Sequence, residues 1–143
     1  MTALSRGALA LFFVVAGTAH FLTPTPYLAI TPPYVPWPAA MVAVSGAAEI
    51  LGGLAVCFRF TRRAAGWWLI ALLVAVLPAN IQAISTGMVL GEYVVPEWIL
   101  WVRLLLQLLL IIWVWRVCRG RTSGRPKAVL RSQRGWKASH LRL

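Results

Sequence analysis

The chain has 143 residues, of which 60% are hydrophobic, yet its 14 Lys and Arg outnumber three Asp and Glu for a formal net charge of +11. Only 12% of the residues are charged, about half the share of a typical soluble domain, and mean hydropathy is +0.77, which argues against an ordinary cytosolic protein. Nucleic-acid binding, the usual interpretation of a pI near 11.5, would need a separate basic module, so we expect no nucleic-acid partner.

Four apolar runs follow one another along the chain, and each is about as long as a membrane-spanning helix. They cover residues 4–22, 38–58, 64–85 and 96–117. A crossing takes about 20 residues, so the chain has room for four spans with short loops and little else. We therefore predict an all-α fold, an integral membrane four-helix bundle formed by residues 1–117.

The basic residues predict the orientation of the bundle, because loops rich in Lys and Arg stay on the cytoplasmic side. Arg6 begins the first run, three arginines lie within residues 59–63, and eight Lys and Arg follow residue 118. The other two loops carry no Lys or Arg, and one of them holds Glu92 and Glu97. We predict that both termini are cytoplasmic.

The first run also has features of a secretory signal peptide. Arg6 precedes an apolar stretch, and Gly17-Thr18-Ala19 resembles a cleavage site. Cleavage there would leave three spans and an outside N-terminus. We favour an uncleaved span, because the apolar run continues through Phe21 and Leu22 beyond the cleavage site.

The last segment, residues 118–143, contains the eight basic residues and few apolar ones. We predict that it is disordered in water and lies on anionic lipids of the inner leaflet, where each Lys or Arg contributes ~1 kcal/mol. The two cysteines, Cys57 and Cys118, form no C-x-x-C pair, and we expect free thiols.

Polar side chains interrupt each of the four apolar runs. They are His20, Glu49, Asn80, Arg103 and Gln107. An ionisable group within a span costs about 2.5–3.5 kcal/mol on insertion scales, which makes it a functional candidate. All five lie at the midplane or in the outer half of the predicted spans, so we expect one polar site whose residues bind a ligand or handle protons. Arg103 and Gln107, four residues apart, share a helix face.

Each of these residues also has a structural interpretation. Glu49 and Arg103 have opposite charges at similar depth, and they would form an ion pair that fixes helix register. For His20, a hydrogen bond to a loop carbonyl is the simpler alternative. The two amide side chains would connect neighbouring helices, and Pro78 frees a backbone carbonyl that must be satisfied inside the bundle.

The loop over residues 23–38 holds six of the nine prolines, so it cannot be a long helix. It carries Tyr27, Tyr34 and Trp37 and no charge. These aromatic residues fit an aromatic belt at the headgroup level. The alternative is a lid that closes the polar site to all but apolar or amphipathic ligands.

Metal and haem chemistry fit these residues poorly. A haem held by two histidines is excluded, because only His20 lies in the predicted spans. One His and one Glu with weak amide ligands also disfavour a metal site.

Several spaced motifs combine the candidate residues. They are His20-Phe21 followed by Pro24, Tyr27, Ile30, Pro32, Pro36 and Pro38, then Ser45-Gly46-x-x-Glu49-x-x-Gly52-Gly53, Pro78-Ala79-Asn80-Ile81 and Arg103-x-x-x-Gln107. From about Arg6 to Trp115, the chain resembles the DoxX family of small four-helix bacterial membrane proteins. The resemblance implies a multi-pass protein of the bacterial cytoplasmic (inner) membrane, linked to quinone or sulfur redox chemistry and without a covalently bound cofactor.

Our first functional hypothesis is a redox-linked, quinone-associated accessory subunit, without catalytic activity alone, that binds a small lipophilic ligand at the polar site beside a partner redox protein. The alternative is a non-enzymatic assembly or interaction factor for membrane proteins, which a distant animal branch of the family resembles. A small-solute transporter is third, because four helices would have to dimerise and the sequence shows no inverted repeat.

Overall fold

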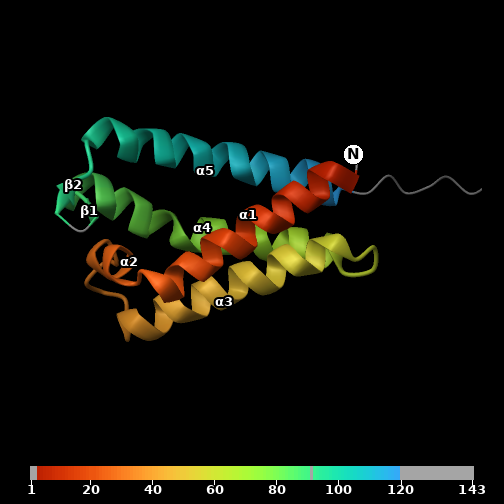
Figure 1. Ribbon diagram of the computed structural model, residues 1–143, viewed down its shortest axis with the longest axis horizontal. Helices are drawn as coiled ribbons and strands as arrows, with labels where there is room; N and C mark the ends of the chain where they lie inside the picture. The colour runs from red at the N-terminus through yellow and green to blue at the C-terminus, as the bar shows by residue number, and fades with distance from the viewer. Residues whose placement is uncertain (1–2, 91, 120–143) are drawn as a thin grey trace, which may run out of the picture.

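The computed structural model describes residues 3–90 and 92–119. The predicted basic tail lies outside these residues from position 120 onward. The described chain forms five helices and two short strands (Figure 1). In order, they are α1 (Ala3–Leu22), α2 (Thr25–Ala29), α3 (Pro38–Cys57), α4 (Arg62–Thr86), β1 (Val89–Leu90), β2 (Tyr93–Val94) and α5 (Glu97–Cys118).

Four of the helices, α1, α3, α4 and α5, are long and apolar enough to cross a membrane. Their ends differ by at most two residues from the runs predicted from the sequence. Proline marks two of the starts, since α3 begins at Pro38 and Pro96 precedes α5, positions where the missing N–H costs no helical hydrogen bond.

The connection from α1 to α3 and the connection from α4 to α5 were predicted as loops, but both contain regular secondary structure. The proline-rich loop includes the five-residue helix α2, and the loop before α5 forms the antiparallel hairpin of β1 and β2. Gly87, with φ of +77°, ends α4 and turns the chain into the hairpin. Val94 pairs with Val89, a β-branched pair suited to a strand.

Glycines bring α1 and α3 close together. A Cβ on Gly17 would lie 2.5 Å from the backbone oxygen of Gly46, and one on Gly46 would lie 2.8 Å from that of Gly17. Further along the same interface, a Cβ on Gly53 would lie 2.8 Å from the Cβ of Phe13. Small residues at these positions allow the backbones to approach.

The other helix pairs meet in chain order. Gly52 of α3 faces Leu69 of α4, and the indole N–H of Trp68 donates to the carbonyl of Ala48 at 3.2 Å. On α4, Gly66 lies directly beneath Cys118 of α5. The helices therefore follow the spatial sequence α1, α3, α4 and α5.

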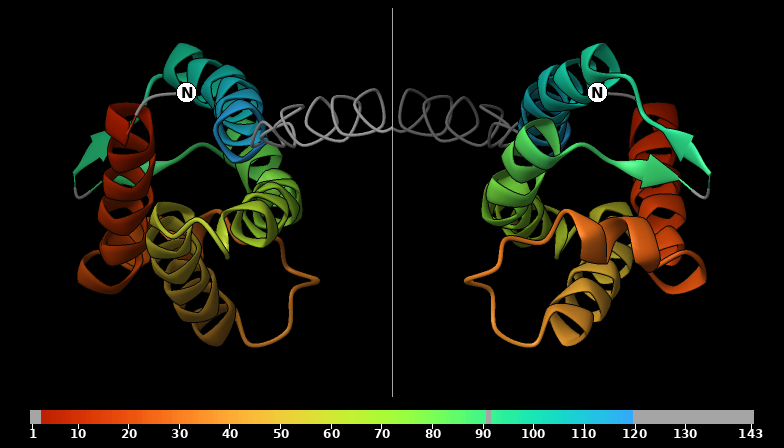
Figure 2. Two further views of the ribbon diagram at one scale, coloured as in Figure 1. Left: turned by 90° about the vertical axis from the view of Figure 1, so that its right-hand side faces the viewer. Right: turned by 90° about the vertical axis from the view of Figure 1, so that its left-hand side faces the viewer.

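Two separate buried clusters close the bundle at its ends. The larger, at the end that holds Ala3 and Cys118, combines Leu9, Phe13, Val56, Ala65, Leu69, Leu73, Val114, Val117 and Cys118. The smaller, at the end that holds α2 and the hairpin, combines Ile30, Ala83, Met88 and Leu100. Figure 2 shows α2 and the hairpin across this second end of the bundle. Between the two clusters, the bundle is hollow.

Candidate functional site

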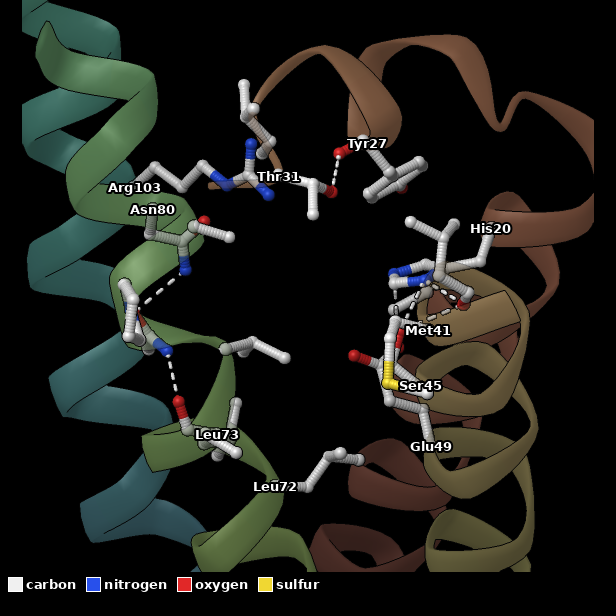
Figure 3. A pocket seen from close by; sticks show the side chains of 18 of the residues that line it. His20, Tyr27, Thr31, Met41, Ser45, Glu49, Leu72, Leu73, Asn80 and Arg103 are labelled. Atoms are coloured by element: carbon white, nitrogen blue, oxygen red, sulfur yellow. Dashed lines mark hydrogen bonds and ion pairs between the residues drawn. The ribbon is translucent and has the colours of Figure 1, made fainter. Parts of the chain in front are cut away.

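The hollow is a cavity of about 880 Å³, within the range of small-molecule sites. All four long helices line it, together with α2 and the segment that follows α2. Most of the lining side chains are apolar, and the polar groups stand on two facing walls (Figure 3). All five polar residues singled out from the sequence, one or more from each long helix, line this single cavity.

The first wall is formed by α1 and α3 and carries His20 and Glu49. The close contact between Gly17 and Gly46 brings these side chains together, so that Nε2 of His20 lies 3.9 Å from Oε2 of Glu49. Glu49 is only 8% exposed, and its Oε2 is buried without a hydrogen-bond partner among the described residues. A buried carboxylate oxygen without a partner is costly.

The hydrogen bonds of His20 define which ring nitrogen carries its proton. Nδ1 lies 3.1 Å from the carbonyl oxygen of Val42 and 3.1 Å from Oγ of Ser45, which itself donates to that carbonyl. Because a carbonyl can only accept, Nδ1 must be the donor. Nε2 is therefore the basic nitrogen of a neutral ring, and it faces Glu49. At 3.9 Å the two atoms are too far apart for a hydrogen bond, but one proton carried by either group makes them a neutral pair (on Glu49) or an ion pair (on His20).

The second wall is formed by α4 and α5, and its two amide side chains are joined by hydrogen bonds. Nδ2 of Asn80 donates to Oε1 of Gln107 at 2.9 Å, and Nε2 of Gln107 donates to the carbonyl of Leu73 at 2.6 Å. Pro78 lies inside α4 and has no N–H to donate to a carbonyl of the preceding turn. The amide of Gln107 donates to a carbonyl of that same turn, the one of Leu73. Asn80 and Gln107 thus hold α4 and α5 together at the proline, as their structural interpretation expects.

Arg103 stands on the same wall, above the amides. Its Nη1 donates to Sδ of Met88 at 3.2 Å, a weak acceptor for a guanidinium with five N–H donors. Within the described residues, Glu49 forms its close charged contact with His20 and not with Arg103. The ion pair considered from the sequence is therefore not formed: the two charges stand on opposite sides of the cavity (Figure 3).

The three aromatic residues considered as a lid occupy different positions. Tyr27 and Tyr34 line the cavity, whereas Trp37 does not and is 76% exposed at the start of α3. The ring of Tyr27 stacks on that of His20, with centroids 4.0 Å apart. Burial raises the pKa of the Tyr27 phenol, so the phenol stays neutral in the lining of the cavity.

Sequence reasoning missed Ser45 as a partner of His20, and Met88 and Thr31 as neighbours of Arg103 and Tyr27. Ser45 stands four residues before Glu49 in the quoted motif, but nothing in the sequence indicates that it bonds to His20. Thr31 lines the cavity, and its hydroxyl donates to the carbonyl of Tyr27 at 2.8 Å. Nothing in the apolar context of Met88 distinguishes it from other methionines.

The chemistry available in the cavity follows from these bonds. On the amide wall, Nδ2 of Asn80 and both polar atoms of the Gln107 amide form hydrogen bonds, whereas Oε2 of Glu49 forms none within the described chain and Arg103 uses one donor on a sulfur. Within residues 3–90 and 92–119, no group of three or more His, Cys, Asp or Glu is placed to hold a metal ion. The site is arranged to bind a mainly apolar molecule with polar atoms at two ends.

Comparison with known proteins identifies the family. The model of the family described as "Domain of unknown function (DUF8561)" matches residues 9–118, which span all four long helices, and the chain belongs to this family. No curated protein and no solved structure matches the chain.

Proposed function

We propose that this DUF8561 protein is a multi-pass membrane protein that binds a quinone-type lipophilic molecule in the cavity and serves as an accessory subunit of a redox system, without catalytic activity alone. The observation that carries the proposal is the buried Oε2 of Glu49, which lacks a partner and stands opposite the guanidinium of Arg103 in an otherwise apolar cavity. Two unfilled charged groups on facing walls are suited to a guest with two polar ends.

The membrane setting rests on the four apolar helices and on the distribution of charge. Large apolar side chains cover the outside of these helices, as bilayer contact requires. The turn between α3 and α4 carries Arg59, Arg62 and Arg63, on the side where α1 begins and α5 ends. By the positive-inside rule, this side is cytoplasmic and the α2 side faces outward. The resemblance to DoxX proteins adds the bacterial cytoplasmic membrane as the location.

A quinone ring matches the two walls because its carbonyl oxygens accept hydrogen bonds at opposite ends of a flat apolar ring. Arg103 would donate to one carbonyl oxygen. A proton carried by Nε2 of His20 or by the carboxyl of Glu49 would be donated to the other carbonyl oxygen, since Nδ1 of His20 is already engaged by Val42. The DoxX resemblance supports a redox setting for such a ligand.

The test is equilibrium binding of a short-chain ubiquinone analogue to the full chain in lipid nanodiscs, followed by tryptophan fluorescence, since Trp113 lines the cavity. Each charged hydrogen bond contributes about 1.5–3 kcal/mol, so Glu49→Leu, which has no donor, and Arg103→Ala should each weaken binding about tenfold or more. The matched controls are Glu97→Leu and Arg116→Ala, exposed residues outside the cavity.

Unchanged binding in both cavity variants, with unfolding midpoints equal to wild type, would overturn the proposal. Mass spectrometry of molecules that co-purify in mild detergent gives a second readout. A stoichiometric membrane protein without any lipophilic molecule would instead support the assembly-factor alternative.

A further inference from the structure

One side of the bundle is open. The helices α1 and α3, α3 and α4, and α4 and α5 pack pairwise, whereas α1 and α5 barely touch. The two are joined near their ends by a hydrogen bond of 3.1 Å from the indole N–H of Trp113 to Oγ of Ser5.

Side chains at this opening belong to the cavity and to the outer surface at once. Phe12 of α1 and Leu106 and Leu109 of α5 line the cavity, yet they are 46%, 58% and 60% exposed. A single layer of side chains therefore separates the cavity from the surroundings of the bundle.

A second hollow, of about 460 Å³, lies along α1 and is lined by Ala8, Leu11, Phe12, Val15 and Ala16, all apolar. Two of these residues, Phe12 and Ala16, also line the cavity, so both hollows border on this part of α1. Because Ala8, Phe12 and Ala16 are spaced by four residues, the hollow follows one face of α1 for about 12 Å.

Buried apolar clusters lie at both ends of the bundle axis. Ile30, Met88 and Leu100 pack together at the end with the hairpin, and the cluster that contains Phe13 and Val114 lies at the other. A molecule dissolved in the bilayer would therefore enter the cavity from the side, between helices.

From the sparse contact of α1 with α5 and the lining residues that the two hollows share, we infer that the cavity takes a chain-bearing amphiphile, with the polar head group between Arg103 and Glu49 and the hydrocarbon chain leaving between α1 and α5 to lie in the hollow along α1. The inference rests on the proposed function and adds the ligand class and its orientation. The chain stays in apolar surroundings along this path, whereas the head exchanges lipid contacts for the charged groups.

The alternative exit lies between α3 and α4, where Met41 and Val44 line the cavity and are 41% and 59% exposed. The segment between α2 and α3 passes this side (Figure 2) and contributes Tyr34 and Val35 to the lining. The second hollow lies on α1, which favours the α1 side.

Two photoreactive quinone analogues test the inference with the full chain in lipid nanodiscs. One carries a diazirine on the ring, and the other carries it at the end of a decyl chain; labelled residues are located by mass spectrometry. We expect saturable labelling of cavity residues by the ring probe. The chain-end probe should label residues 8–16 of α1 and the facing part of α5, and competing unlabelled analogue should suppress it.

A tryptophan placed in the hollow supplies the matched comparison. Ala8→Trp should reduce chain-end labelling of α1 about tenfold and leave ring labelling unchanged, because it fills the hollow without touching the cavity. Ala71→Trp, the same change at an exposed alanine of α4 outside the cavity, should alter neither.

The outcomes separate the two proposals. Saturable ring labelling with the chain end on Val44 and its α4 neighbours would overturn the exit beside α1. Chain-end labelling that competitor does not suppress, or that Ala8→Trp leaves intact, would overturn it as well. Loss of saturable ring labelling would overturn the proposed function itself.

Discussion

The two walls of the cavity use buried polar groups in opposite ways. On the wall of α4 and α5, Asn80 donates to Gln107, which in turn donates to the carbonyl of Leu73. On the wall of α1 and α3, Glu49 is equally buried, but its Oε2 has no hydrogen-bond partner among the described residues. Buried polarity alone therefore does not mark a binding group; unfilled hydrogen-bonding capacity does.

The walls also differ in what holds them together. Glycine contacts between backbones stabilise the first, and side-chain hydrogen bonds stabilise the second. This contrast leads to four predictions on the free energy of unfolding.

The largest effect is expected at the glycine contact. Gly46→Ala would place a Cβ 2.7 Å from that of His20 and 2.8 Å from the backbone oxygen of Gly17, so α1 must move away. We expect a loss of about 3 kcal/mol, measured by denaturant titration in detergent. Gly7→Ala is the control, because its Cβ meets nothing within 4 Å. Equal stability of the two variants would refute the close packing.

Next in size is the amide network. Gln107→Leu removes the partner of Asn80 and of the Leu73 carbonyl at once, and we expect a loss of about 2 kcal/mol in the same titration. Gln82→Leu, also on a spanning helix, serves as the control, since its side-chain amide makes no hydrogen bond within the described chain. If Gln107→Leu is as stable as wild type, the hydrogen bonds of Asn80 and Gln107 do not stabilise the contact of α4 with α5.

A smaller loss of stability is expected at the hydrogen bond between α1 and α5. Trp113→Phe removes the bond to Ser5 and should cost about 1 kcal/mol. The matched change is Trp98→Phe at an indole that is 66% exposed. If both variants unfold at the same denaturant concentration, the bond between α1 and α5 does not stabilise the bundle.

The smallest effect on stability is expected at Glu49, one of the two residues proposed to bind the guest. Glu49→Gln keeps the shape of the side chain and removes a buried charge, so stability should stay within about 0.5 kcal/mol of wild type. Thermal unfolding without ligand measures it. A loss as large as that of Gln107→Leu would make Glu49 a structural group.

The sequence predicts the four long helices because each is a continuous apolar run of sufficient length. It also identifies the polar residues of the cavity, since a polar group stands out in an apolar run. It does not tell which helices are neighbours. Similar depth suggested that Glu49 pairs with Arg103, but depth carries no information on rotation about the helix axis or on helix order.

The contact of α1 with α3 decides this pairing. It places His20 beside Glu49 and leaves Arg103 on the far wall with Met88, a residue 15 positions away across the hairpin. The hairpin and α2 were equally hidden, because elements of two to five residues lack a periodic pattern.

The packing of Gly66 beneath Cys118 has a practical consequence. Cys118 is covered, whereas Cys57 is exposed at the end of α3, beside the arginine-rich turn. The native chain thus presents one accessible thiol at one face of the bundle. A membrane-impermeant maleimide added to sealed vesicles reports the sidedness of that turn as a single mass increment, so the topology can be measured without an engineered reporter.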